Sequence, residues 1–246
     1  MKRDFSVLCL ASFLVWVRVE ASDADGLIHW LLEDDRELKD IPFSEVVKAT
    51  TDKQILPINA TNDVDRLLLQ KINSALDRVL ARMNMPNSIV QQQRRINEVS
   101  SYFESAIKQE LNAVPGFVCD FPKTSAGHVQ RSGYPDLRLE DKTSGRVLYL
   151  DPKLYERGSR ESSFRTFYFE PKKETNKIHD DAHHLIVGIE HDGRQKGVWK
   201  FLRWELVDLS RFHVRLKAEF QASNRDLYRP EATVARGAAT EKPVAK

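Results

Sequence analysis

The feature that most limits what this chain can fold into is a change in the spacing of its apolar residues at Pro115 and Gly116. Before this point, apolar side chains recur every three or four residues, which is the spacing that lines one face of a helix. Beyond it, they alternate with polar side chains or form short apolar runs, as in strands. Helices followed mostly by strands predict a mixed α/β or α+β domain, in which helices flank a central sheet.

Two helices are predicted before this change. The first covers about residues 64–84, with Asn62 or Asp63 suited to the N-cap position, and should stop at the next proline. The second begins with Ser88 as its cap and ends at Pro115. We expect the two to form a helical hairpin. Their apolar stripes consist of Leu67, Leu68, Ile72, Leu76, Val79, Leu80 and Met83 in the first, and of Ile96, Val99, Phe103, Ile107 and Leu111 in the second.

Seven segments beyond Gly116 carry the alternating or apolar pattern of strands. Those at 136–141 and 146–155 flank the sequence Lys-Thr-Ser-Gly, so they predict a hairpin with Gly145 in its turn. The apolar run at 185–193 is typical of a central strand that is covered on both faces. The remaining strand segments cover residues 117–121, 161–171, 197–209 and 211–220.

The beginning of the chain has the features of a signal peptide over residues 1–21. It combines a basic start, an apolar run of thirteen residues from Phe5 to Val17, and the small residue Ala21 before the expected cut. The run is shorter than the roughly 20 residues that span a membrane. We therefore expect an exported protein, periplasmic or secreted, with no membrane contact after signal cleavage. An uncleaved amphipathic or buried helix is the alternative.

The rest of the chain divides into three parts. Residues 22–87 form an N-terminal segment that shows no sustained apolar period apart from its helix, and so adds a helical extension to the domain. Residues 88–228 form the main domain. Residues 229–246 are rich in Ala, Pro and charged residues and are expected to be a disordered tail.

Global charge says little about partners. Thirty-eight Lys and Arg residues against thirty-six Asp and Glu residues give a net charge of +2, so any basic surface for nucleic acid must be local. Two local candidates exist, although each is also typical of an ordinary solvent-facing side. They consist of Lys172, Lys173 and Lys177, and of Arg211, Arg215 and Lys217 on an alternating strand.

Asp151 and Lys153 lie two residues apart in a predicted strand, so their side chains point to the same face. If the hairpin forms, Asp136 lies beside the far end of the second strand. Two carboxylates on neighbouring strands suit a hard cation such as Mg²⁺, which takes few protein ligands besides water and substrate phosphate. A lysine beside them suits hydrolysis, because its ammonium can orient the attacking water and the scissile phosphate. The alternative is an exposed strand pair of charges without a ligand.

In Pro135, Asp136, Asp151 and Lys153 the chain resembles the PD-(D/E)xK phosphodiesterases, which include restriction endonucleases, Holliday junction resolvases and repair nucleases. The resemblance covers about residues 88–192. It implies a restriction endonuclease-like core, with a helix, a strand, a strand entered by the Pro-Asp pair, a strand with the acid and the lysine, then a helix and a further strand. It also implies that the two aspartates hold Mg²⁺ or Mn²⁺.

The resemblance further implies a helper glutamate from the preceding helix. Glu98, Glu104 and Glu110 are available, and Glu104 is chosen because it borders the apolar stripe on a helical wheel. Pro152 departs from the expected pattern, since a residue without an N–H group fits an edge strand or a bulge more easily than a central strand.

A second group of possible ligands comprises His179, His183 and His184 with Asp180 and Asp181. Two histidines four residues apart on a helix are typical of a Zn²⁺ site. Without a third defined ligand, the pattern is more typical of a solvated capping cluster at the start of a strand. His184 could still reach the phosphate site.

The expected function is therefore that of a metal-dependent nuclease that acts on DNA, an endonuclease of the PD-(D/E)xK type. Two other classes stay open. One is an exported, non-catalytic module that binds nucleic acid or a protein on a nuclease-like fold, and the other is a cell-surface structural protein. The resemblance is compatible with a homodimer as well as with a monomer.

Overall fold

The computed structural model describes residues 22–33, 38–217 and 219–237, which fall into two units. Residues Asp40–Val214 form the larger unit, and the described residues on either side of it form the smaller one. The predicted signal peptide and the end of the predicted disordered tail lie outside the described residues. No described helix is long and apolar enough to cross a membrane.

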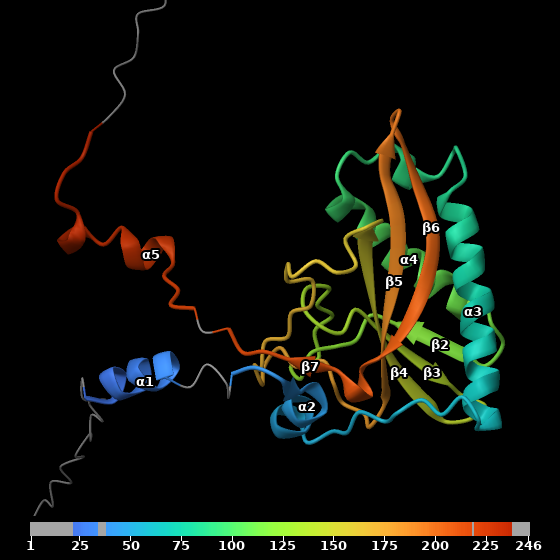
Figure 1. Cartoon of the computed structure of the whole chain (residues 1–246), viewed down its shortest axis with the longest axis horizontal. Coiled ribbons are helices and arrows are strands. Elements are labelled where there is room, and N and C mark those ends of the chain that lie inside the picture. The colour runs from blue at the N-terminus through green and yellow to red at the C-terminus, as the bar shows by residue number, and fades with distance from the viewer. Residues whose placement is uncertain (1–21, 34–37, 218, 238–246) are drawn as a thin grey trace, which may run out of the picture. The chain divides into compact units, whose positions relative to one another are not determined.

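The larger unit is built on a five-stranded sheet (Figure 1). The strands lie across the sheet in the order of the chain, and only β4 and β5 run parallel, whereas the other neighbouring pairs are antiparallel. The predicted fold class, a mixed sheet flanked by helices, is confirmed. The strands are β2 (Phe117–Asp120), β3 (Leu137–Asp141), β4 (Arg146–Glu156), β5 (His183–Gln195) and β6 (Val198–Asp208).

Two long helices, α3 (Asp63–Met83) and α4 (Ile96–Asn112), pack against each other and against one face of the sheet. α3 begins where the sequence predicts, because the Asn62 side chain accepts hydrogen bonds from the backbone N–H groups of Val64 and Asp65. This capping satisfies N–H groups that have no partner within the helix.

The apolar stripes of the two helices form the core between the helices and the sheet. Phe103 and Ile107 of α4 and Ile72 of α3 are completely buried there. Leu67 is an exception to the predicted stripe, since its side chain is 53% exposed. The neighbouring Leu68 takes the inward position, because successive helical residues point about 100° apart.

The sequence predicts that the second helix begins at Ser88. In the structure, α4 begins only at Ile96. Ser88 precedes only a short 3-10 helix, Ile89–Gln92. The Gln91 side chain accounts for the break, because it bonds to both the N–H and the C=O of Trp199 in β6. This contact holds the segment against the sheet and prevents it from continuing as a helix.

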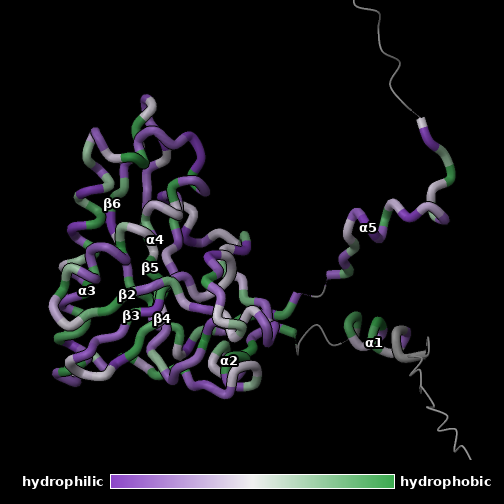
Figure 2. Tube along the Cα trace, turned by 180° about the vertical axis from the view of Figure 1, so that it is seen from behind, coloured by the Kyte–Doolittle hydropathy of each residue, from purple (hydrophilic) through white to green (hydrophobic). Residues whose placement is uncertain are grey.

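Alternate residues of β4 point to opposite faces of the sheet. Leu150 belongs to the core under α3 and α4, whereas Tyr149 belongs to a second apolar cluster, which is centred on Phe43. Asp151 and Lys153 follow Tyr149 at two-residue spacing, so they lie on this second face. Figure 2 shows the alternation of hydrophobic and hydrophilic residues along the chain.

The N-terminal segment contributes a helix that the sequence does not predict, α2 (Phe43–Thr51). Phe43 and Val47 are fully buried and anchor it in the second cluster. The strand predicted at 211–220 shrinks to β7 (His213–Val214), which pairs with β1 (Ile41–Pro42). The smaller unit contains the helices α1 (Ser22–Glu33) and α5 (Asn224–Leu227).

The connection from β4 to β5, residues 157–182, contains neither the strand predicted at 161–171 nor the helix implied between the two strands. Its alternating Phe167 and Phe169 pack against the second cluster and are partly buried there without a strand partner. Asp180 accepts hydrogen bonds from the side chains of Arg138 and Tyr149. These contacts hold a parallel crossover that is more often a helix.

Candidate functional site

The β3–β4 hairpin brings Asp136 and Asp151 together. Leu137 pairs with Leu150 at the last register position that the two strands share. Asp136 directly precedes Leu137, and Asp151 directly follows Leu150, so both adjoin the last paired position. The Asp136 carboxyl group interacts with Asp151 electrostatically and through a side-chain hydrogen bond. The two carboxylates therefore meet at the open end of the hairpin, as the sequence predicts.

Asp136 is partly buried and has an unusual pKa. Burial is the largest cause that raises the pKa of Asp136 to about 8, and the negative charge of Asp151 raises it further. Lys153 lowers this pKa, whereas Glu104 and a hydrogen bond with Asp151 raise it. The four side chains share one electrostatic environment, and at neutral pH without a cation Asp136 carries a proton.

Asp151 is 1% exposed, and the Lys153 ammonium lies 2.6 Å from its Oδ2 atom. The contact is an ion pair without the alignment of a hydrogen bond, so Oδ2 is a buried oxygen with no hydrogen-bond partner in the described part of the chain. The Lys153 ammonium is thus the charged neighbour of this oxygen, and a buried carboxylate oxygen with such a displaceable neighbour suits a hard cation. The Lys153 side chain is 35% exposed, so its ammonium lies between the buried acid and solvent.

β4 can accommodate Pro152 because the edge of the strand that faces β3 is no longer paired at this position. β3 stops pairing with β4 at Leu150, so from Asp151 onward the structure pairs β4 only with β5, in the region that it describes. Pro152 stands opposite Val187 of β5. A residue without an N–H group is tolerated where one side of the strand has no partner.

Among the three candidate glutamates of α4, Glu104 is the one whose charge reaches the acid pair. It raises the pKa of Asp136, and its carboxylate lies 2.6 Å from the Arg131 guanidinium. Glu98 instead caps the first turn of α4, and Glu110 forms ion pairs with two arginines of α3. The helix therefore directs only the chosen glutamate toward the site.

Lys177 is a second lysine near the acid pair. The sequence predicts it on an exposed basic surface, but its side chain is 1% exposed. Its ammonium donates hydrogen bonds to the backbone carbonyls of Gln130 and Gly133, just before Asp136. Burial lowers the pKa of Lys177, and the three carboxylates of the site raise it. No local pattern in the sequence indicates this position.

The histidines do not form a metal site. His184 is fully buried with Nδ1 2.7 Å from the Tyr134 hydroxyl, and burial lowers the pKa of His184 to about 3, so the ring is neutral. His179 and His183 each contact a backbone carbonyl. Within the described ranges, no three His, Cys, Asp or Glu side chains are arranged to hold a metal ion by themselves. The acid pair would thus supply two ligands and leave the others to water and substrate.

The remaining residues predicted to contact nucleic acid belong to different elements of the two units. Lys172 and Lys173 are exposed on the β4–β5 connection. Arg211 is exposed at the end of a 3-10 helix that follows β6. Arg215 and Lys217 lie in the smaller unit, because the predicted strand stops before them.

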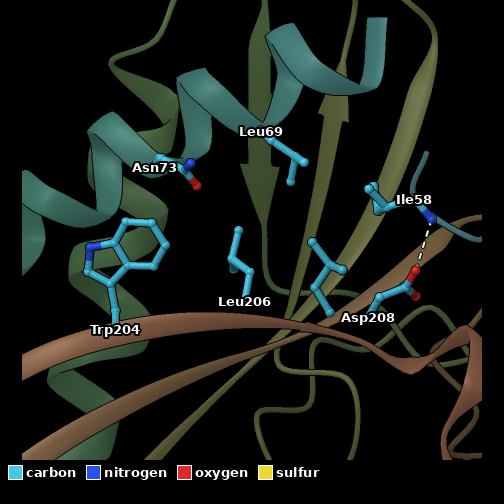
Figure 3. A pocket seen from close by; sticks show the side chains of 7 residues that line it. Ile58, Leu69, Asn73, Trp204, Leu206 and Asp208 are labelled. Atoms are coloured by element: carbon cyan, nitrogen blue, oxygen red, sulfur yellow. Dashed lines mark hydrogen bonds between the residues drawn. The ribbon is translucent and has the colours of Figure 1, made fainter. Parts of the chain in front are cut away.

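A cavity of about 250 Å³ lies on the helix-covered face of the sheet, between α3 and β6 (Figure 3). Its lining is mostly apolar. The Asp208 carboxylate accepts hydrogen bonds from the backbone N–H groups of Ile58 and Ser210 and so has a structural role. The acid pair remains the candidate site. The cavity is lined by Ile58, Leu69, Asn73, Leu185, Trp204, Leu206 and Asp208.

Comparisons with known proteins identify relatives of this chain. The sequence profile of the type II restriction enzyme MjaV family matches residues 36–231. The type II restriction enzyme MjaV of Methanocaldococcus jannaschii is 30% identical over 209 residues, which cover 80% of this chain and 89% of that protein. Restriction endonucleases generally belong to the PD-(D/E)xK proteins, so these matches confirm the resemblance seen in the sequence.

The same matches contradict the expectation of export. Enzymes of the matched class act on DNA inside the cell, so the predicted secretion is wrong, and the signal-peptide interpretation of residues 1–21 is wrong with it. A basic start followed by a short apolar run is not specific to signal peptides, because amphipathic and buried helices carry it too.

Proposed function

This chain belongs to the type II restriction enzyme MjaV family, and on that premise we propose that it is an endonuclease that hydrolyses phosphodiester bonds of DNA at Asp136, Asp151 and Lys153. One observation carries the proposal. The buried Asp151 lies beside Asp136 at the open end of the β3–β4 hairpin. The Lys153 ammonium lies 2.6 Å from its Oδ2 atom, which makes no aligned hydrogen bond among the described residues. Two acids and an amine in this arrangement suit the hydrolysis of a phosphodiester.

Asp136 and Asp151 are the residues that would hold a divalent cation, Mg²⁺ or Mn²⁺. The donor set suits such an ion, because hard cations prefer carboxylate oxygens and Mg²⁺ usually takes only one or two protein carboxylates. When bound, the cation lowers the pKa of a water molecule and neutralises charge that develops on the phosphate. Asp136 contributes as a ligand only after it has lost the proton that it holds at neutral pH.

Lys153 and Glu104 act beside the acid pair. The Lys153 ammonium is partly exposed, so it can leave the Asp151 carboxylate and contact the scissile phosphate or the attacking water. Glu104 faces the same environment from α4 and is the proposed helper, held in place by Arg131.

The test compares the unchanged chain with Asp151→Asn and Lys153→Met on total genomic DNA, which offers every sequence, in the presence of Mg²⁺ or Mn²⁺. We expect the unchanged chain to produce discrete fragments. Each substitution should lower the cleavage rate by at least about a hundredfold, because each removes a group that stabilises the transition state. Lys142→Met is the matched control, since Lys142 is a turn lysine with a side chain that is 58% exposed.

The outcomes separate the alternatives. Cleavage at the same rate in all four proteins would point to a contaminant or to another site and would refute the role of the acid pair. DNA binding by the unchanged chain without cleavage under any metal condition would support the non-catalytic module instead. Fragments from the unchanged chain and the control, but not from the two site variants, would support the proposal.

A further inference from the structure

The β4–β5 connection, residues 157–182, begins directly after the strand that carries Asp151 and Lys153. It returns to β5 past the buried Lys177, whose charge interacts with Asp136 and Asp151, so the part of the connection around Lys177 lies near the proposed site.

The first part of the connection, residues 157–176, holds five basic against three acidic side chains. Arg157 and Arg160 form ion pairs with acids of β5 and β6, whereas the exposed Arg165 forms no ion pair in the described part of the chain. The Arg165 guanidinium is therefore available to DNA phosphates.

Two aromatic residues fix the connection to the larger unit. Phe167 packs edge-on against Phe43 and Tyr134, with ring centroids 5.1 Å apart in both pairs. Phe169 packs against Phe43 in the same manner, at 5.4 Å. Edge-to-face packing is a favourable arrangement of aromatic rings. The connection is thus held in place although it contains no helix or strand.

Neighbouring side chains of the connection point into solvent. Phe164 is 86% exposed and Tyr168 is 51% exposed. The Arg165 guanidinium lies 5.3 Å from the centre of the Tyr168 ring. Single exposed apolar residues are common, but exposed rings combined with arginine are the combination that stacks on bases and binds phosphates.

Tyr134 links this connection to the acid pair. Its ring contacts Phe167, and its hydroxyl lies 2.7 Å from Nδ1 of His184 behind the site. In the chain it directly precedes Pro135 and Asp136. The connection is therefore in contact, through Phe167 and Tyr134, with the segment that carries the first carboxylate.

We propose that Phe164, Arg165 and Tyr168 contact DNA beside the scissile phosphate and help to select the DNA that is cleaved. The inference rests on the proposed function and adds a recognition surface to it. The two rings stack on bases or pack against sugars, and Arg165 binds phosphate. DNA is favoured over a second copy of the chain as the occupant, because in a symmetric pair of copies the Arg165 guanidinium would meet its own like charge.

The test measures DNA binding in the Asp151→Asn background, so that the DNA stays intact. Fluorescence anisotropy with a mixed-sequence duplex gives the dissociation constant at several salt concentrations. Phe164→Ala and Tyr168→Ala should each weaken binding by about tenfold, because each removes a stacking partner. Arg165→Ala should weaken binding. It should also reduce the slope of the logarithm of the binding constant against the logarithm of the salt concentration by about one, because one phosphate contact is lost.

The matched control is Phe220→Ala, which removes an equally exposed ring, 84% accessible, from the smaller unit. It should change binding by no more than about twofold, as is usual for surface substitutions. Circular dichroism and sedimentation are recorded for every variant. An unchanged spectrum shows that lost binding does not come from a lost fold.

The possible results distinguish this inference from the proposed function. If all three variants bind as tightly as their parent while the unchanged chain cleaves DNA, the recognition surface is refuted and the nuclease proposal stands. If the unchanged chain neither binds nor cleaves DNA, both are refuted. If Phe164→Ala binds DNA normally but sediments differently, the ring contacts another copy of the chain, which also refutes the inference.

Discussion

Among single residues, Asp136 has the property that most affects how the site would work. Its pKa of about 8 results first from burial and then from the charge of Asp151. A carboxylate that binds a cation must give up its proton, so the proton and the cation compete for Asp136. Cation binding should therefore be weak in acid and strong above the pKa of this group.

We expect the affinity for Mn²⁺ to rise about tenfold per pH unit below pH 8 and to level off above it, since one proton is displaced for each cation. Isothermal titration calorimetry in two buffers of different ionisation enthalpy measures both the affinity and the released proton. Asp120→Asn is the control, because this carboxylate is 68% exposed and pairs with Lys108 instead. A flat profile between about pH 6 and pH 8 would contradict a protonated Asp136.

A positioning role for Lys177 can be tested separately. Lys177→Met removes the hydrogen bonds to the carbonyls of Gln130 and Gly133, together with a positive charge near the carboxylates. We expect the cleavage rate to fall by about tenfold or more, because the segment before Asp136 loses its anchor. The pH midpoint of Mn²⁺ binding should rise, since loss of a nearby positive charge raises the pKa of a carboxyl group.

A matched variant and a second readout keep this test specific. Lys142→Met removes an exposed lysine that pairs with Glu140, and it should leave rate and midpoint unchanged. If Lys177→Met lowers the melting temperature but does not change the pH midpoint of Mn²⁺ binding, Lys177 stabilises the fold and does not position the site.

Among the secondary-structure elements, α4 carries both a core face and the proposed helper residue. Phe103 is completely buried and packs edge-on against Phe201 of β6, with centroids 4.7 Å apart, and Glu104 follows it. Phe103→Ala leaves a cavity between the helix and the sheet, so we expect the free energy of unfolding to fall by about 3–5 kcal/mol. Urea denaturation followed by circular dichroism measures this loss.

Leu67→Ala on α3 is the control for the same experiment. Its side chain is 53% exposed, so truncation should change the free energy of unfolding by no more than about 0.5 kcal/mol. Similar losses in the two variants would show that the core does not lie on the face that carries Phe103.

Elements with a long apolar period, or with a glycine that marks a turn, could be predicted from the sequence. Short elements could not. α3 shows its apolar period over many turns, and the β3–β4 hairpin has Gly145 in its turn. α2 could not be predicted, because nine residues with Phe43 and Val47 as the only buried positions are too few to show a period. The alternation at 161–171 was misleading, since it reflects burial in an aromatic cluster and not a ladder of hydrogen bonds.

In the molecule as a whole, the proposed site brings together residues from several segments. The sequence predicts the positions of some of them and not of others. Asp136, Asp151 and Lys153 belong to one hairpin, so local spacing was enough to predict their meeting. Glu104 could be predicted from its position beside the apolar face of a helix. Lys177 reaches the site through a connection without regular structure, for which no periodicity exists, so neither its burial nor its partners could be predicted.

The β3–β4 hairpin turns at residues 142–145, at the end opposite to the two acids. One residue more or fewer in that turn would shift the pairing, turn one strand's side chains over and put a different residue across from Asp151. The number of residues in a solvent-exposed turn thus sets which groups meet at the other end of the hairpin. Substitutions should be tolerated there except at Gly145, whose φ of +71° favours glycine, whereas insertions and deletions should be as harmful as the loss of an acid.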